Sequence, residues 1–156
     1  MSRDTNNSFA HGYGGILYGL HQANQVLQSN RSEALFQWYQ EQFKENLAIE
    51  ESLNDSWCRG TSGIKYLCDV LHIDFPKKQR KVTQEVTDDC LCHGTCGRLD
   101  YYVDDNFLAR NNYFLKADQE NCPLGLFCGL SGIGYQLLRA FDPEKVPSIQ
   151  FFGKTI

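Results

Sequence analysis

The sequence lacks any long apolar run and any excess of positive charge. None of its apolar stretches approaches the length that a helix needs to cross a bilayer, and residues 1–8 are polar, unlike a signal peptide. With a net charge of −4, the chain also lacks the clustered Lys and Arg that bind phosphates. These absences predict a cytoplasmic protein without a membrane span or a nucleic-acid partner.

Two further absences concern strands and disulfides. No segment shows sustained apolar alternation with a period of two, so we expect few strands. Seven cysteines cannot all pair within one chain, and cytoplasmic thiols stay reduced, which favours metal binding or thiol chemistry. With 156 residues, 42% of them hydrophobic, the chain is long enough for one domain with a real core.

A short Gly-x-x-Gly pattern is repeated along the chain. Its four copies begin at Gly12, Gly60, Gly94 and Gly129. Apolar residues at helical spacing follow the copies, and a further helix between the first two is expected to be capped by Ser32. Other helices are expected after Pro76 and from Asn106. We therefore predict an all-α chain whose helix pairs curve into a solenoid or close into a toroid, with glycines that allow positive φ and close backbone approach.

The residues just before each first glycine are the strongest candidates for chemistry. The pairs are Ala10-His11, Cys58-Arg59, Cys92-His93 and Phe127-Cys128. Equivalent repeats should carry these pairs at one end of the helix ring, where Cys58, Cys92 and His93 could provide three zinc ligands and leave a fourth position open. The alternative is that Cys58 and Cys92 are buried as small apolar residues.

Four segments resemble successive motifs of the lanthionine synthetase C-like family. They are residues 8–16, 56–64, 92–94 and 125–135, and they occur in family order. The ending at residues 142–148 resembles the C-terminus of the cyclase domain in bifunctional class II lanthipeptide synthetases. The resemblance runs from about Ser8 to Ile149.

This resemblance implies an α/α toroid with zinc at one mouth, of which residues 1–156 would form a partial, C-terminal cyclase domain of about four repeats. It assigns Zn²⁺ to Cys58, Cys92 and His93, and it makes His11 the candidate acid/base. The implied reaction adds a cysteine thiol of a precursor peptide to dehydroalanine or dehydrobutyrine in the same peptide, forming a thioether ring. Histidine suits the final protonation because its side chain titrates near neutral pH.

Several residues depart from the family pattern. With four repeats, the chain is expected to lack the early part of the ring, together with an acidic residue that the family uses there. Asn54 stands where some members have Arg, Arg59 where many have Tyr or His, and Cys128 where a hydroxyl residue is usual. Cys90 and Cys96 flank the Cys-His pair and offer an alternative ligand set, although packing roles are the more favoured interpretation for both.

An incomplete ring leaves alternatives to a working enzyme. The chain could be a non-catalytic zinc-bearing module that binds a peptide or glutathione, or a helical scaffold without metal. Its expected partners are a dehydrated precursor peptide and, to cover the open edges of the ring, the missing N-terminal half, a dehydratase domain or a second copy of itself. Alone, the chain is expected to be dimeric, partner-bound or poorly soluble, and at best a weak cyclase.

Overall fold

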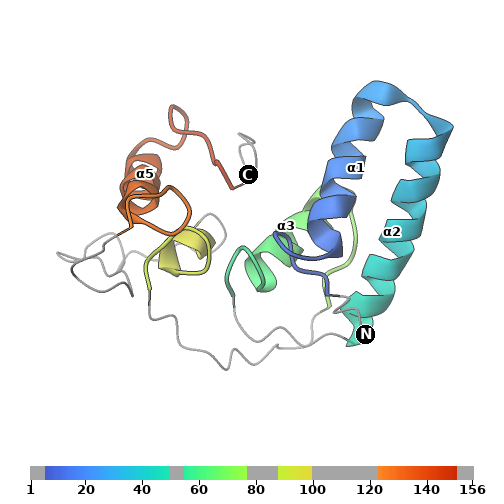
Figure 1. Ribbon diagram of the computed structural model, residues 1–156, viewed down its shortest axis with the longest axis horizontal. Coiled ribbons are helices and arrows are strands. Elements are labelled where there is room, and N and C mark those ends of the chain that lie inside the picture. Colours follow the sequence, from blue (N-terminus) through green and yellow to red (C-terminus); the bar gives the residue numbers. More distant parts are fainter. Residues whose placement is uncertain (1–5, 50–54, 77–87, 100–122, 151–156) are drawn as a thin grey trace. The chain divides into compact units, whose positions relative to one another are not determined.

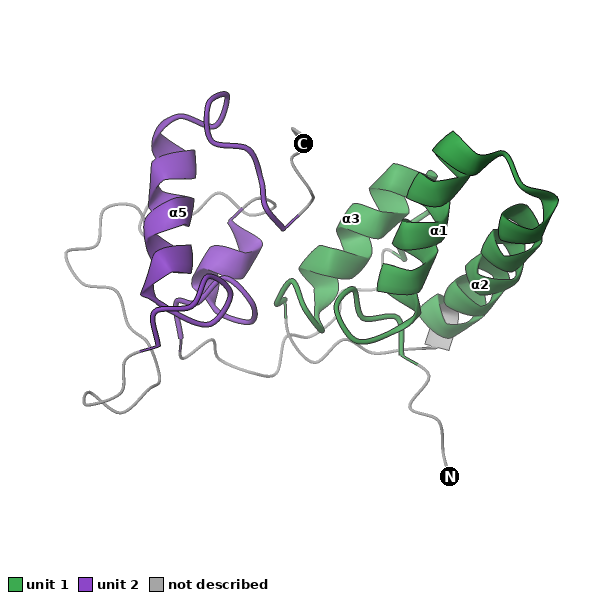
Figure 2. Cartoon of the chain, turned by 45° about the horizontal axis from the view of Figure 1, so that its top comes forward, with its two compact units in different colours: residues 1–83 green, residues 84–156 purple. Residues whose placement is uncertain are grey.

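The computed structural model describes residues 6–49, 55–76, 88–99 and 123–150 of the chain. These residues form four α-helices and one short 3-10 helix, and no strand occurs within the described ranges. The all-α prediction is therefore confirmed. The helices predicted after Pro76 and from Asn106 fall outside the described residues. The chain divides into two compact units, residues 1–83 and 84–156 (Figure 2). The prediction of one partial domain over residues 1–156 stays a prediction.

The described residues of unit 1 form helices α1 (Tyr13–Leu27), α2 (Asn30–Ile49) and α3 (Thr61–Leu71), which are labelled in Figure 1. Helix α1 contacts both α2 and α3. The Phe9 ring, from the loop before α1, lies 5.5 Å from the ring of Trp57, which comes from the loop before α3. Both rings are buried, so the core of this unit reaches into the two glycine loops.

The start of α2 differs from the prediction. Ser32 does not cap this helix, because α2 begins at Asn30 and places Ser32 in its first turn. The Ser32 hydroxyl donates to the carbonyl of Ser29 at 2.9 Å instead. The chain leaves α1 through Gln28, whose φ of 43° lies in the left-handed region, so only two residues separate the helices. Because this connection is so short, α2 begins earlier than a cap at Ser32 would predict.

Unit 2 contains the 3-10 helix η1 (Thr95–Arg98) and helix α5 (Leu130–Phe141). Its core is built on Leu91, Cys96 and Ile133, with three partly buried apolar residues against them: Leu99, Leu137 and Ile149. Within the described residues, the third Gly-x-x-Gly copy is thus followed by a 3-10 turn, whereas the other copies open α-helices.

The glycine loops share one backbone geometry. In three of them the N–H of the first glycine donates to the carbonyl four residues earlier, at 3.0–3.1 Å. These bonds pair Gly12 with Ser8, Gly60 with Ser56, and Gly94 with Cys90. A second backbone hydrogen bond is also repeated. In the fourth loop, Leu130 N–H donates to the carbonyl of Pro123 at 3.0 Å. The equivalent bonds of the first and third loops, from Tyr13 N–H to Asn6 O and from Thr95 N–H to Asp88 O, are both 2.9 Å long. The repeat read from the sequence is therefore a structural repeat as well.

Close backbone approach, and not positive φ, accounts for these glycines. A Cβ on the first glycine would overlap a backbone carbonyl oxygen at Gly12, Gly94 and Gly129. The first glycines have φ values of −131°, −109°, −92° and −141°, which any residue can adopt, so that part of the prediction is wrong. A Cβ on the second glycine would instead overlap the carbonyl oxygen of the residue six positions earlier. This overlap pairs Gly15 with Phe9, Gly63 with Trp57, Gly97 with Leu91, and Gly132 with Leu126.

Gly63→Ala should therefore destabilise unit 1 by about 3 kcal/mol, because the added methyl must displace the Trp57 backbone and would also lie 2.7 Å from Phe9 Cβ. Gly19→Ala is the matched control, since Gly19 lies in α1 and a Cβ added there would meet no neighbouring atom within 4 Å. That change should be neutral or stabilise by up to about 1 kcal/mol, because Ala favours helix over Gly. Urea unfolding of the full chain followed by circular dichroism gives both values. Equal effects of the two changes would contradict the steric explanation.

Candidate metal centre

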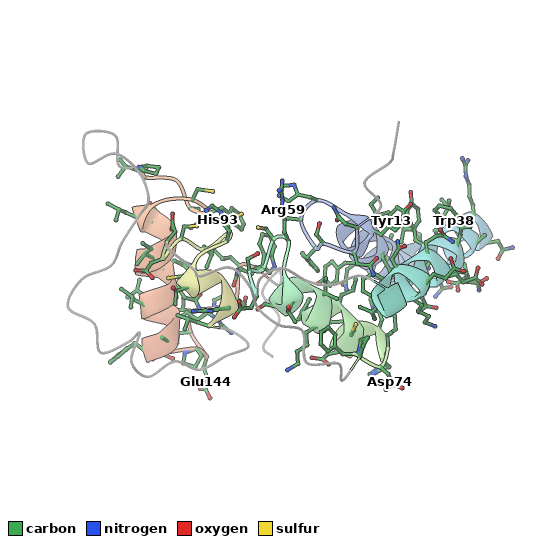
Figure 3. The ribbon with its side chains drawn as sticks, turned by 90° about the horizontal axis from the view of Figure 1, so that it is seen from below. Tyr13, Trp38, Arg59, Asp74, His93 and Glu144 are labelled. Carbon is green, nitrogen blue, oxygen red and sulfur yellow. The ribbon has the colours of Figure 1, made fainter. Side chains whose placement is uncertain are left out.

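The two residues before each first glycine, here called the pre-glycine pair, have a repeated arrangement. The second member is exposed in all four loops: His11, Arg59, His93 and Cys128. Figure 3 shows the Arg59 and His93 side chains projecting from their loops. The residue two positions before the second member packs inward in three of the loops, as Phe9, Trp57 and Leu91. The loops thus direct one side chain into the core and another to the surface.

The first members of the pairs join neighbouring loops. In unit 1, Ala10 N–H donates to the carbonyl of Cys58 at 3.0 Å. In unit 2, Cys92 N–H donates to the carbonyl of Phe127 at 2.8 Å. The same bond therefore links consecutive loops at the same position in both units. It brings the loop of His11 beside that of Cys58, and the loop of Cys92 and His93 beside that of Phe127.

The candidate sulfur ligands differ in burial. Cys58 is 4% exposed, with its Sγ 3.8 Å from the Ser56 hydroxyl, whereas Cys92 is half-buried. All six cysteines within the described residues are free of disulfides. Cysteine thiols and a histidine imidazole are the sulfur and nitrogen donors that suit Zn²⁺. The residues present therefore fit zinc in chemical type.

A carboxylate that the sequence reasoning missed lies beside His93. Asp88 Oδ1 accepts the backbone N–H of Cys90 at 2.6 Å, and its Oδ2 lies 4.0 Å from His93 Nε2. A carboxylate next to a ligating histidine commonly orients the ring and favours one tautomer. The only signal in the sequence is an acidic pair, Asp88-Asp89, just before Cys90.

Unit 2 also contains a second possible ligand group. Asp88, Cys90 and His93 each offer a ligand atom, and these atoms lie within 4.8 Å of one another. Cys90 is fully buried, and this burial raises the pKa of its thiol to about 11. Metals bind the thiolate, and burial disfavours that charged form of Cys90. Cys96 is also fully buried, in the apolar cluster with Leu91 and Ile133.

The expected ligands are divided between the two units. Cys58 belongs to unit 1, and Cys92 and His93 belong to unit 2. His11 lies in unit 1 and is exposed. Asn54 is outside the described residues. The ligand set of Cys58, Cys92 and His93, and the role of His11, therefore stay predictions at this point.

None of the helices in the described part of the chain combines the length and apolar character of a membrane span.

Comparison with models of protein families shows which family the chain belongs to. The family model described as lanthionine synthetase C-like protein matches residues 1–122. The match includes the first three glycine loops, and the fourth, at Gly129, follows it with the same steric requirement at its second glycine. No curated protein matches the sequence significantly. The family fold is a helical toroid, in agreement with the helices of both units, and its cyclase activity is directed at peptides. The chain belongs to the lanthionine synthetase C-like protein family.

Proposed function

We propose that the chain acts as a zinc-dependent lanthipeptide cyclase, or as the C-terminal part of one of the class II type. In this proposal Cys58, Cys92 and His93 hold Zn²⁺, and His11 supplies a proton. The observation that carries it is the repeated loop. Cys58 and Cys92 are the first members of consecutive pre-glycine pairs, the position at which neighbouring loops are hydrogen-bonded within each unit. Side chains at that position in consecutive loops are suited to share one ion.

The donor set supports zinc and leaves room for a substrate. Two thiolates and one imidazole make three ligands, and catalytic zinc sites keep one position open. Zinc bound there would lower the pKa of a substrate cysteine thiol, so that the thiolate forms at neutral pH. Cys58, Cys92 and His93 would hold the ion, and the loop of Cys58 is hydrogen-bonded through Ala10 to the loop that carries His11, the proposed proton donor.

The reaction adds S–H across a carbon–carbon double bond of the peptide. The substrate thiolate attacks the β-carbon of dehydroalanine or dehydrobutyrine, which moves the π electrons toward the α-carbon and its carbonyl. His11, in its protonated form, then donates a proton to the α-carbon. The proton lost from the thiol balances the one gained, so no oxidant or reductant is needed. Because His11 is exposed, its imidazole is open to a bound peptide.

A cyclisation assay with a peptide that has already been dehydrated tests this function. We expect the zinc-loaded chain to remove the peptide's alkylatable thiol without changing its mass, since cyclisation is an isomerisation. A chelator should stop the reaction, and added Zn²⁺ should restore it. A chain that binds zinc and peptide but leaves the thiol alkylatable, both alone and in the complete assembly, would instead be a non-catalytic binding module.

Asp88→Asn should weaken zinc binding about ten- to a hundredfold, the usual effect of losing a carboxylate partner of a ligating histidine. Asparagine can still accept the Cys90 N–H, so mainly the charge beside His93 is lost. Asp142→Asn is the control, because Asp142 Oδ1 also accepts a backbone N–H, that of Lys145, at 3.3 Å. Competition with a chromophoric chelator measures both affinities. Equal affinity of the Asp88 variant and the wild type would remove Asp88 from the site.

A further inference from the structure

The segment after α5 returns to the loop that carries Cys92 and His93. Gln150 is fully buried, and its Nε2 donates to the carbonyl of Leu91 at 2.9 Å and to that of Gly97 at 3.1 Å. Leu91 directly precedes Cys92, and Gly97 is the second glycine of the pattern. A primary amide has two N–H donors, so one side chain can satisfy both carbonyls. Gln150 therefore links the two ends of the loop of residues 91–97.

The peptide unit between Leu91 and Cys92 is held from both sides. Its carbonyl accepts from Gln150, and its N–H, which belongs to Cys92, donates to the carbonyl of Phe127 at 2.8 Å. A peptide unit is planar, so fixing both its oxygen and its nitrogen fixes the direction in which the chain enters Cys92. These two hydrogen bonds therefore hold in place the backbone from which the Cys92 side chain extends.

We propose that Gln150 is a positioning residue that holds the loop of residues 91–97 in the conformation that presents Cys92 and His93 to the metal. The consequence for zinc rests on the proposed function, whereas the hold on the loop does not. The Leu91 carbonyl oxygen lies so close to Gly97 that a Cβ on this glycine would overlap it. The two residues whose carbonyl groups Gln150 binds are therefore in close contact with each other. Without the amide, two buried carbonyls would lose their donors, and the loop would open to find others.

Other contacts hold the same segment, which allows the amide to be tested separately. Tyr135 donates its hydroxyl to the carbonyl of Pro147 at 2.9 Å, and Arg139 Nη1 donates to Val146 O at 2.7 Å. Ile149 packs against the cluster of Leu91, Cys96 and Ile133. The segment should therefore remain docked when only the donors of Gln150 are removed.

The first measurement is made on the zinc-free full chain. Gln150→Met keeps the length of the side chain without its donors, and Gln150→Glu keeps its shape. In both variants Cys90 and Cys96, which are fully buried, should be alkylated about tenfold faster or more through opening of the loop, while Cys58 and Cys68 in unit 1 keep their rates. Tyr135→Phe, which removes a bond to the same segment, should leave all four rates unchanged. Mass spectrometry of the labelled peptides resolves each cysteine.

Unchanged alkylation of Cys90 and Cys96 in both Gln150 variants would overturn the proposal. So would amide exchange in α5 that rises as much as exchange in the loop, because Gln150 would then support the whole unit. The second measurement adds metal: both variants should bind Zn²⁺ about ten- to a hundredfold more weakly and alter the thiolate-to-cobalt absorption band of the Co²⁺-substituted chain. Wild-type chain that binds no metal, together with faster alkylation in the variants, would leave the hold on the loop in place and refute the proposed function instead.

Discussion

Replacing Cys58, Cys92 or His93 by alanine should remove bound zinc from the purified chain. Each change deletes one of three protein ligands, so the loss of affinity should exceed the roughly ten- to hundredfold that follows loss of a carboxylate beside a ligating histidine. Cys68→Ala and Cys96→Ala are matched controls, because both residues are fully buried cysteines, one on α3 and one in η1. They should cost stability through a small cavity and still retain zinc. Metal content per chain, measured by mass spectrometry, distinguishes the two groups.

The pattern of loss identifies the ligand set. Full zinc in all three ligand variants would show that the proposed site is wrong. Loss of zinc on changing Cys90, with Cys58→Ala unaffected, would assign the ion to the group of Asp88, Cys90 and His93 within unit 2.

In whatever complete assembly is active, His11→Asn should slow thioether formation by about two to four powers of ten, the usual effect of removing a general acid. The variant should keep its zinc, because His11 is proposed to deliver a proton and not to bind the ion. His72→Asn is the control: His72 is exposed, ends α3 with a φ of 54°, and asparagine tolerates that left-handed conformation. Its cyclisation rate should match the wild type. Zinc loss from the His11 variant would move that residue into the ligand set, and an unchanged rate would end its role as acid.

The fold was accessible from the sequence because its repeat is enforced sterically. The second glycine of every copy, and the first glycine at Gly12, Gly94 and Gly129, leave no room for a Cβ beside backbone atoms, which accounts for the repeated pattern in the sequence. The start of α2 was missed because a tight connection through a left-handed Gln28, and not a serine cap, sets it. The 3-10 turn after Gly94 was missed as well, since glycine spacing is the same before a 3-10 turn as before an α-helix.

The candidate ligands could be proposed from spacing, because they sit at repeated positions before Gly60 and Gly94. The residues that support these ligands could not be proposed from spacing. Gln150 reaches carbonyls 53 and 59 residues away, and contacts across such separations leave no periodic signal. The one hint is a polar residue between Ile149 and Phe151 in an otherwise apolar stretch. Asp88 is recognised by the position of its carboxylate, 4.0 Å from His93 Nε2, which composition does not reveal.

X-ray absorption at the zinc edge tests the central claim most directly, because it counts the sulfur ligands of the bound ion. The sample is the wild-type chain with one zinc, in a buffer free of thiols. Ligation by Cys58, Cys92 and His93 predicts two sulfurs at about 2.3 Å, with nitrogen or oxygen ligands at about 2.0–2.1 Å. A single sulfur would fit Asp88, Cys90 and His93 and would contradict the proposed site, as would a shell containing no sulfur.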